Sequence, residues 1–112
     1  MSLEEWKQSG KFFDHQDHRI FYQLSESSDE VVLCLHGFPT SSHDYHKIWD
    51  ALAERRAVLA FDLIGYGFSA KPADFDYTTF KQVDILAALV DNLKIKKVHL
   101  LAHDYGNTLT QE

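Results

Sequence analysis

The feature that most constrains this chain is a short apolar run that ends in a tight polar turn. Residues 98–102 are largely apolar, and the sequence His-Asp-Tyr-Gly follows at once. Small residues therefore stand two positions before and two positions after Asp104, at Ala102 and Gly106. Small neighbours let the backbone pass through a strained strand-to-helix turn, and they leave the central side chain exposed above the strand end. The pattern predicts a buried strand followed by an accessible carboxylate at Asp104.

The residues after this turn, Asn107 to Leu109, read as the start of a helix. Amides at a helix N-terminus favour negative charge, so the amide beside Asp104 is placed to hold an oxyanion. A carboxylate held in line and partly desolvated can displace a leaving group from a saturated carbon. The turn therefore predicts nucleophilic chemistry rather than a simple connection.

The rest of the chain alternates between strand and helix patterns. Aromatic-rich runs over 11–15 and 19–24 predict a hairpin, and continuous apolar runs over 31–35 and 56–61 predict strands buried on both faces. Helical spacing of apolar residues follows each buried strand. The order predicts an α/β fold in which an antiparallel hairpin leads into a mostly parallel sheet with flanking helices.

Apolar residues at helical spacing predict the core-facing side of each helix. A capping box is predicted before each stripe, at Ser41 with Asp44 and at Thr79 with Gln82. The expected core residues are Tyr45, Ile48, Trp49 and Leu52 in the first helix and Val83, Leu86, Ala87, Val90 and Leu93 in the second.

Composition narrows the partners and the compartment. The 112 residues suit one domain, and a net charge of −6 with no basic cluster larger than residues 94–97 argues against nucleic acid. The single cysteine, Cys34, lies in an apolar run and is expected to be a buried, unreactive side chain. No apolar stretch approaches the ~20 residues that span a bilayer, and the N-terminus lacks a signal-peptide pattern. We expect a cytoplasmic location with no membrane segment in these residues.

Three segments carry a family resemblance: HGFPTSS (36–42), DLIGYGFSAKP (62–72) and LLAHDYGNT (100–108). They occur in this order, and each is associated with the end of a predicted strand. Together they resemble the N-terminal part of α/β-hydrolases that use an Asp nucleophile, a group that includes haloalkane dehalogenases and epoxide hydrolases. The resemblance covers nearly the whole chain. It implies that residues 1–112 form the N-terminal part of a single α/β-hydrolase domain, without the cap and the C-terminal part.

The resemblance also implies roles for individual residues. Asp104 would be the nucleophile, and the backbone amides of Phe38 and Tyr105 would form the oxyanion hole. The residues that would shape the two loops are His36, Gly37 and Gly106. No cofactor and no metal are implied, and the expected partner is a small apolar substrate.

Two departures bear on the substrate. Haloalkane dehalogenases generally place Trp after the nucleophile and often Asn after His-Gly, as halide donors, whereas this chain has Tyr105 and Phe38. Epoxide hydrolases commonly share His-Gly-Phe-Pro, which this chain carries at 36–39. The resemblance therefore favours epoxide opening over dehalogenation, and it leaves the identity of the substrate and the oligomeric state open.

A larger departure concerns the general base. In this fold an acid and then a His follow the nucleophile, but all seven histidines of this chain precede Asp104. We expect the 112 residues alone to be inactive and to belong to a longer hydrolase. The alternative is a non-catalytic module of the same fold that binds a ligand or a partner.

Two other interpretations are weaker. His36, His43 and His46 invite a zinc site, but no Cys or carboxylate set accompanies them. Gly65 and Gly67 resemble a dinucleotide fingerprint, yet that fingerprint must open directly into a helix and here a Lys-Pro pair intervenes. A structural turn is the preferred interpretation.

Overall fold

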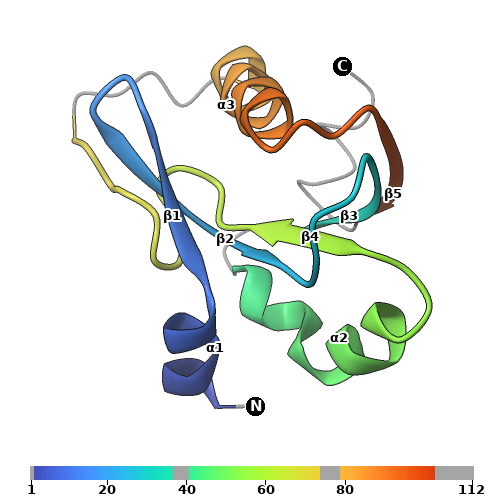
Figure 1. The fold of residues 1–112 in the computed structure, drawn as a ribbon. Coiled ribbons are helices and arrows are strands. Elements are labelled where there is room, and N and C mark those ends of the chain that lie inside the picture. The colour runs from blue at the N-terminus through green and yellow to red at the C-terminus, as the bar shows by residue number, and fades with distance from the viewer. Residues whose placement is uncertain (1, 37–40, 74–78, 103–112) are drawn as a thin grey trace.

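The computed structural model of the protein describes residues 2–36, 41–73 and 79–102. Within these residues, five strands form one sheet in the order β1-β2-β4-β3-β5 (Figure 1). The elements in chain order are α1 (Leu3–Ser9), β1 (Lys11–His15), β2 (His18–Leu24), β3 (Glu30–Leu35), the 3-10 turn η1 (Ser42–Tyr45), α2 (His46–Ala53), β4 (Val58–Phe61), α3 (Thr79–Asn92) and β5 (Lys97–Ala102).

The hairpin predicted near the N-terminus is confirmed. β1 and β2 pair antiparallel from Lys11 opposite Tyr22 to His15 opposite His18. Gln16 and Asp17 form the turn with φ of 49° and 70°. Positive φ at both positions matches the right-handed twist of the flanking strands. β2 then pairs antiparallel with β4 and joins the hairpin to the rest of the sheet.

The predicted parallel part of the sheet is also confirmed. β3 pairs parallel with β4 on one side and with β5 on the other. Crossovers between parallel strands are almost always right-handed, and these two run in opposite directions along the sheet. The connecting helices α2 and α3 therefore lie on opposite faces, with α1 beside α2 (Figure 1).

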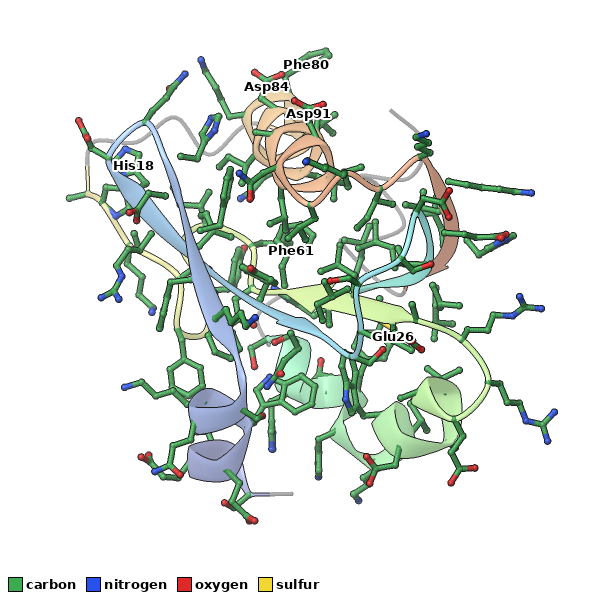
Figure 2. All side chains as sticks on the ribbon, viewed as in Figure 1. His18, Glu26, Phe61, Phe80, Asp84 and Asp91 are labelled. Carbon is green, nitrogen blue, oxygen red and sulfur yellow. The ribbon has the colours of Figure 1, made fainter. Side chains whose placement is uncertain are left out.

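Each face of the sheet has its own apolar layer. One layer packs under α3 and includes Phe61, whereas Asp84 and Asp91 project from the outer side of that helix (Figure 2). The other layer lies against α1 and α2 and is built around Trp6 and Trp49, whose rings meet edge to face with centroids 5.2 Å apart.

Helix α1 was not anticipated by the sequence analysis, although its signal is present. Ser2 accepts a hydrogen bond from the Glu5 amide, and the Glu5 side chain accepts one from the Ser2 amide. This reciprocal pair is a capping box, which the spacing Ser-x-x-Glu encodes. The helix buries Trp6 completely, so the N-terminal residues contribute to the core.

The predicted core faces of the two longer helices need correction. Tyr45, which ends η1, and Trp49 of α2 are buried as predicted, but Ile48 of α2 is 43% exposed. In α3 the most deeply buried residues are Gln82, Ile85 and Leu89. The predicted residues Val83, Leu86, Val90 and Leu93 are partly buried and pack against the same apolar layer, whereas Ala87 is exposed. The apolar surface of α3 is therefore wider than the predicted stripe.

The helix caps also differ in part from the prediction. Ser41 accepts a hydrogen bond from the His43 amide and caps η1 as predicted. Gln82, expected to cap α3, instead donates to the Ile64 carbonyl oxygen at 3.1 Å. Its side chain therefore ties α3 to the loop that follows β4.

An open apolar groove of about 260 Å³ runs between α3 and β5. Val98 and Leu100 of β5 are 36% and 50% exposed, and β5 is the edge strand among the residues that the structure describes. The predicted third strand is confirmed as a strand, but its described side chains are exposed rather than buried. The groove is lined by Leu33, Leu35, Val83, Leu86, Ala87, Val90, Val98 and Leu100.

We expect the 112-residue polypeptide, expressed alone, to bind hydrophobic dyes strongly and to unfold over a broad transition, because this groove and strand edge face water. Fluorescent dye titration and calorimetry would measure both. Leu100→Lys should reduce aggregation by placing a charge on the edge. A sharp unfolding transition with low dye binding in the unsubstituted polypeptide would contradict the expectation.

Candidate functional site

The carboxyl ends of β3, β4 and β5 meet at one edge of the sheet, as the parallel pairing requires. His36 follows β3 and Asp62 follows β4. Ligands in such sheets collect at this edge. Of the predicted site residues, His36 is described by the structure, whereas Gly37, Phe38, Asp104, Tyr105 and Gly106 lie outside the described residues.

His36 is buried and joins two loops of this edge. Its Nε2 accepts a hydrogen bond of 3.0 Å from the Leu63 amide. A ring nitrogen that accepts is unprotonated, so the proton of a neutral ring is on Nδ1. The ring also meets Tyr66 edge to face at 5.4 Å. These contacts suit a residue that braces the start of the 36–42 loop, and they occupy the nitrogen that a general base would use.

Asp62 is the second organising residue of this edge. Its carboxylate is fully buried and accepts hydrogen bonds of 2.7 Å from the amides of Ser42 and Phe68, one on each oxygen. Its carbonyl oxygen accepts from the Ser69 hydroxyl at 2.6 Å. Buried charge is tolerated when such donors satisfy it. Asp62 thus holds the 41–45 segment and its own loop together.

Gly67 explains the glycine pattern after β4. Its φ is 53°, and a Cβ at this position would lie 2.2 Å from the Asp62 Oδ2 atom. Glycine is required by both the backbone conformation and the close approach of the carboxylate. Residues 65–73 form turns and no helix. The interpretation of Gly65 and Gly67 as a structural turn, rather than a dinucleotide fingerprint, is confirmed.

Trp6 extends this network to the N-terminal helix. Its indole Nε1 donates a buried hydrogen bond of 3.0 Å to the Ser42 hydroxyl. The Ser42 amide donates to Asp62, so one residue joins α1 to the loop after β4. Sequence reasoning missed this connection, because no local pattern relates residues that lie 36 positions apart.

Tyr45 connects the ends of two strands. Its buried hydroxyl lies 2.5 Å from the Leu35 carbonyl oxygen and 3.3 Å from the Leu101 carbonyl oxygen. Burial, with smaller effects of the neighbouring Cys34 and Asp44, raises the pKa of Tyr45 to about 12. Helical periodicity predicts Tyr45 only as a core residue, since it does not show what a hydroxyl reaches.

The residues weighed as metal ligands are engaged elsewhere. The His43 and His46 rings stack with centroids 4.0 Å apart, and His46 Nδ1 lies 2.7 Å from the His43 carbonyl oxygen. His36 Nε2 meets the Leu63 amide. Within 2–36, 41–73 and 79–102, no group of three or more potential ligands could hold a metal ion.

Cys34 behaves as the sequence predicts. The side chain is fully buried in β3, and burial raises the pKa of its thiol to about 12. The reactive thiolate is therefore scarce at ordinary pH. Cys34 contributes to packing rather than to chemistry.

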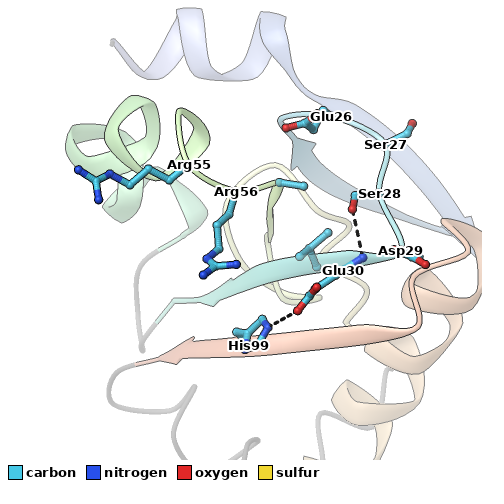
Figure 3. A pocket seen from close by; sticks show the side chains of 10 residues that line it. Glu26, Ser27, Ser28, Asp29, Glu30, Arg55, Arg56 and His99 are labelled. Atoms are coloured by element: carbon cyan, nitrogen blue, oxygen red, sulfur yellow. Dashed lines mark hydrogen bonds and ion pairs between the residues drawn. The ribbon is translucent and has the colours of Figure 1, made fainter.

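A separate polar pocket of about 290 Å³ lies at the opposite, amino edge of the sheet (Figure 3). His99 Nε2 contacts the Glu30 carboxylate at 2.7 Å, and Lys97 Nζ lies 3.8 Å from the same oxygen. The His99 side chain is exposed, and its ring is paired with Glu30. The other side chains around this pocket include Glu26, Asp29, Arg55 and Arg56, so neither sign of charge dominates it.

We expect the pKa of Glu30 to be below its ordinary value, because His99 donates a hydrogen bond to it and Lys97 adds a nearby positive charge. A lowered folded-state pKa stabilises the protein above the unfolded pKa, and this contribution is lost as pH falls through the folded value. NMR titration of the Glu30 carboxyl should show the lowered value. His99→Ala should raise it further than Lys97→Ala does, and an unchanged titration in His99→Ala would contradict the assignment.

No helix within the described parts of the chain is long and apolar enough to cross a membrane.

Comparison with known proteins gives consistent matches. The alpha/beta hydrolase fold family matches residues 30–110. The human mesoderm-specific transcript homolog protein is 47% identical over 117 residues, covering 99% of this chain and 35% of that protein. Among solved structures, haloalkane dehalogenase DbeA from Bradyrhizobium elkani superposes with a TM-score of 0.83 and 39% identity over 91% of this chain and 35% of that one. An epoxide hydrolase from Vigna radiata gives a TM-score of 0.82 and 32% identity over 91% of this chain and 32% of that one.

This chain spans about a third of the length of the curated relatives that it matches.

Proposed function

This chain belongs to the α/β-hydrolase fold family, and on that premise we propose that it forms the N-terminal part of a hydrolase that uses Asp104 as a covalent nucleophile. The observation that supports this most directly is the bracing of one sheet edge. His36 and Asp62 hold the loops after β3 and β4 through buried hydrogen bonds. β5 pairs parallel with β3, so its carboxyl end lies at the same edge, and Asp104 follows two residues later in the sequence.

The proposed reaction has two steps. In the first, a carboxylate oxygen of Asp104 attacks a saturated carbon of the substrate, the bond from that carbon to the leaving group breaks, and an ester forms. In the second, water attacks the ester carbonyl carbon, and the amides of Phe38 and Tyr105 stabilise the oxyanion. The tetrahedral intermediate then collapses: the bond from the carbonyl carbon to the alkoxy oxygen breaks, that oxygen takes up the proton that the general base removed from water, and an alcohol and the Asp104 carboxylate result. One such donor typically contributes about 2.7–4 kcal/mol to lowering the barrier.

We propose a small apolar epoxide as the substrate class. Phe38 and Tyr105 occupy the positions where dehalogenases carry halide donors, and neither supplies the expected side-chain N–H. Opening an epoxide places negative charge on the leaving oxygen, so an acid must protonate it. A haloalkane remains the second substrate class to test, because dehalogenases are among the structural relatives.

The second step also needs a general base. The seven histidines of the chain all precede Asp104, and the Nε2 of His36 is engaged by Leu63. We propose that the base and its acid partner come from sequence beyond the 112 residues, which represent about a third of the curated relatives. The reading frame after Glu112 is the direct check.

Isotope labelling tests the mechanism. In a single turnover in H₂¹⁸O with excess complete protein, water attacks the ester carbonyl, so ¹⁸O should enter the Asp104 carboxylate and be absent from the alcohol. A slowly hydrolysed epoxide should also leave an adduct on the peptide that contains Asp104, detected by mass spectrometry. Label in the product alone would indicate direct attack by water. Absence of both adduct and turnover, for epoxides and haloalkanes alike, would favour the non-catalytic alternative.

A further inference from the structure

The hydroxyl of Tyr45 lies where two strands end. It is within hydrogen-bond reach of the Leu35 carbonyl oxygen at 2.5 Å and of the Leu101 carbonyl oxygen at 3.3 Å. Leu35 is the last residue of β3, and Leu101 is the penultimate residue of β5. These contacts join elements that are far apart in the chain.

Only one donor is available for these two acceptors. A phenol has one hydroxyl proton, and the carbonyl groups only accept. The hydroxyl therefore donates chiefly to the Leu35 carbonyl oxygen, and its longer hydrogen bond to the Leu101 carbonyl oxygen is weaker. The raised pKa of Tyr45 keeps that proton in place throughout the ordinary working range of pH. The hydroxyl therefore remains a donor across that range of pH.

Tyr45 is itself held in place. It ends η1, whose first residue, Ser42, donates its amide to the buried carboxylate of Asp62. The Tyr45 ring is buried in the apolar layer that also contains Trp49 and Cys34. The short segment from 42 to 45 is thus fixed at both ends, and it can impose a distance on the strands it contacts.

Resting on the proposed function, we propose that Tyr45 is a positioning residue that sets the spacing between the carboxyl ends of β3 and β5, and hence between the amides of Phe38 and Tyr105. β3 and β5 are neighbouring parallel strands with Leu35 in register with Ala102. Phe38 lies three residues after Leu35 and Tyr105 lies three residues after Ala102. Two donors serve one oxyanion only when both approach it to about 2.7–3.1 Å, so the spacing of the strand ends matters.

This role distinguishes the two steps of the reaction. Ester formation at a saturated carbon develops no oxyanion on the Asp104 carbonyl, whereas ester hydrolysis does. Tyr45→Phe keeps the ring and removes only the hydroxyl. A displacement of about 1 Å between reacting groups can slow a reaction by about 10²-fold, and a smaller displacement slows it less. We therefore expect Tyr45→Phe to slow ester hydrolysis about tenfold and ester formation by less than about twofold.

Rapid-quench mass spectrometry of the complete protein measures both rate constants in one experiment, with a slowly hydrolysed epoxide as the probe. Single-turnover rate constants report only the molecules that react, so partial unfolding of a variant lowers the amplitude and not the ratio of the two steps. Tyr22→Phe, which removes a hydroxyl from a buried tyrosine on β2, is the matched control and should leave both steps unchanged. The carbonyl ¹³C resonance of Leu35 should shift in Tyr45→Phe and not in Tyr22→Phe.

The outcomes separate this inference from the proposed function. Accumulation of the Asp104 ester in Tyr45→Phe, above the unsubstituted protein, supports the positioning role. An ester that forms and is hydrolysed at unchanged rates, or two steps slowed equally, overturns the positioning role and leaves the nucleophile intact. Absence of any ester in the unsubstituted protein overturns the proposed function and the positioning role together.

Discussion

Replacing Asp104 by Asn is expected to lower turnover of the complete protein by about 10⁴-fold or more, because a neutral amide cannot form the ester on which the reaction depends. Steady-state rates with an epoxide would measure the loss. The mass of the Asp104 peptide should also stay unmodified during incubation with substrate. Asp104→Ala should behave in the same way, which guards against slow conversion of Asn back to Asp.

The matched control is Asp91→Asn, on the exposed side of α3 (Figure 2). It changes the same functional group at a position with no part in the proposed chemistry, and we expect unchanged rates. Substrate binding should also survive Asp104→Asn, since the apolar contacts with the substrate remain. Undiminished turnover in Asp104→Asn would remove the covalent mechanism.

Asp62→Ala is expected to cost about 3–5 kcal/mol of unfolding free energy, the largest stability effect among the described residues outside the apolar layers. The substitution leaves the buried amides of Ser42 and Phe68 without their acceptor, at about 1–3 kcal/mol each, and opens a space beside Gly67. Chemical denaturation of the complete protein would measure the change.

Asp91→Ala serves again as the comparison, because its exposed carboxylate should change stability by less than about 0.5 kcal/mol. Asp62→Asn should fall between the two, since it keeps one acceptor oxygen but turns an amino group toward the other amide. Equal stability of Asp62→Ala and Asp91→Ala would show that water replaces the carboxylate at no cost. In that case Asp62 would not hold the two loops.

Much of the fold was predictable because the information is local. The hairpin follows from two aromatic-rich runs and a two-residue turn, and the parallel strands follow from continuous apolar runs. The strand ends then place His36 and Asp62 at one edge of the sheet. The N-terminal helix could have been predicted from Ser2 and Glu5, since its capping box is written in the sequence.

The predictions that failed concern which surface is covered. Ile48 was expected to be inside and is exposed, and the most deeply buried apolar residues of α3, Ile85 and Leu89, lie beside the predicted stripe, which is only partly buried. Periodicity identifies an apolar side of a helix or strand. It does not identify which neighbour covers that side, because burial depends on elements that are distant in the chain.

The sequence by itself determined the order of most elements and the family, and it predicts a carboxylate at a tight turn, because backbone conformation and hydrophobic pattern are set by neighbouring residues. Only the tertiary structure decided how the edge of the sheet is braced. Trp6 meets Ser42, Asp62 receives two distant amides, and Tyr45 reaches the ends of β3 and β5. A hydrogen bond forms where folding brings donor and acceptor together, and that proximity is a property of the packed chain rather than of any segment within it.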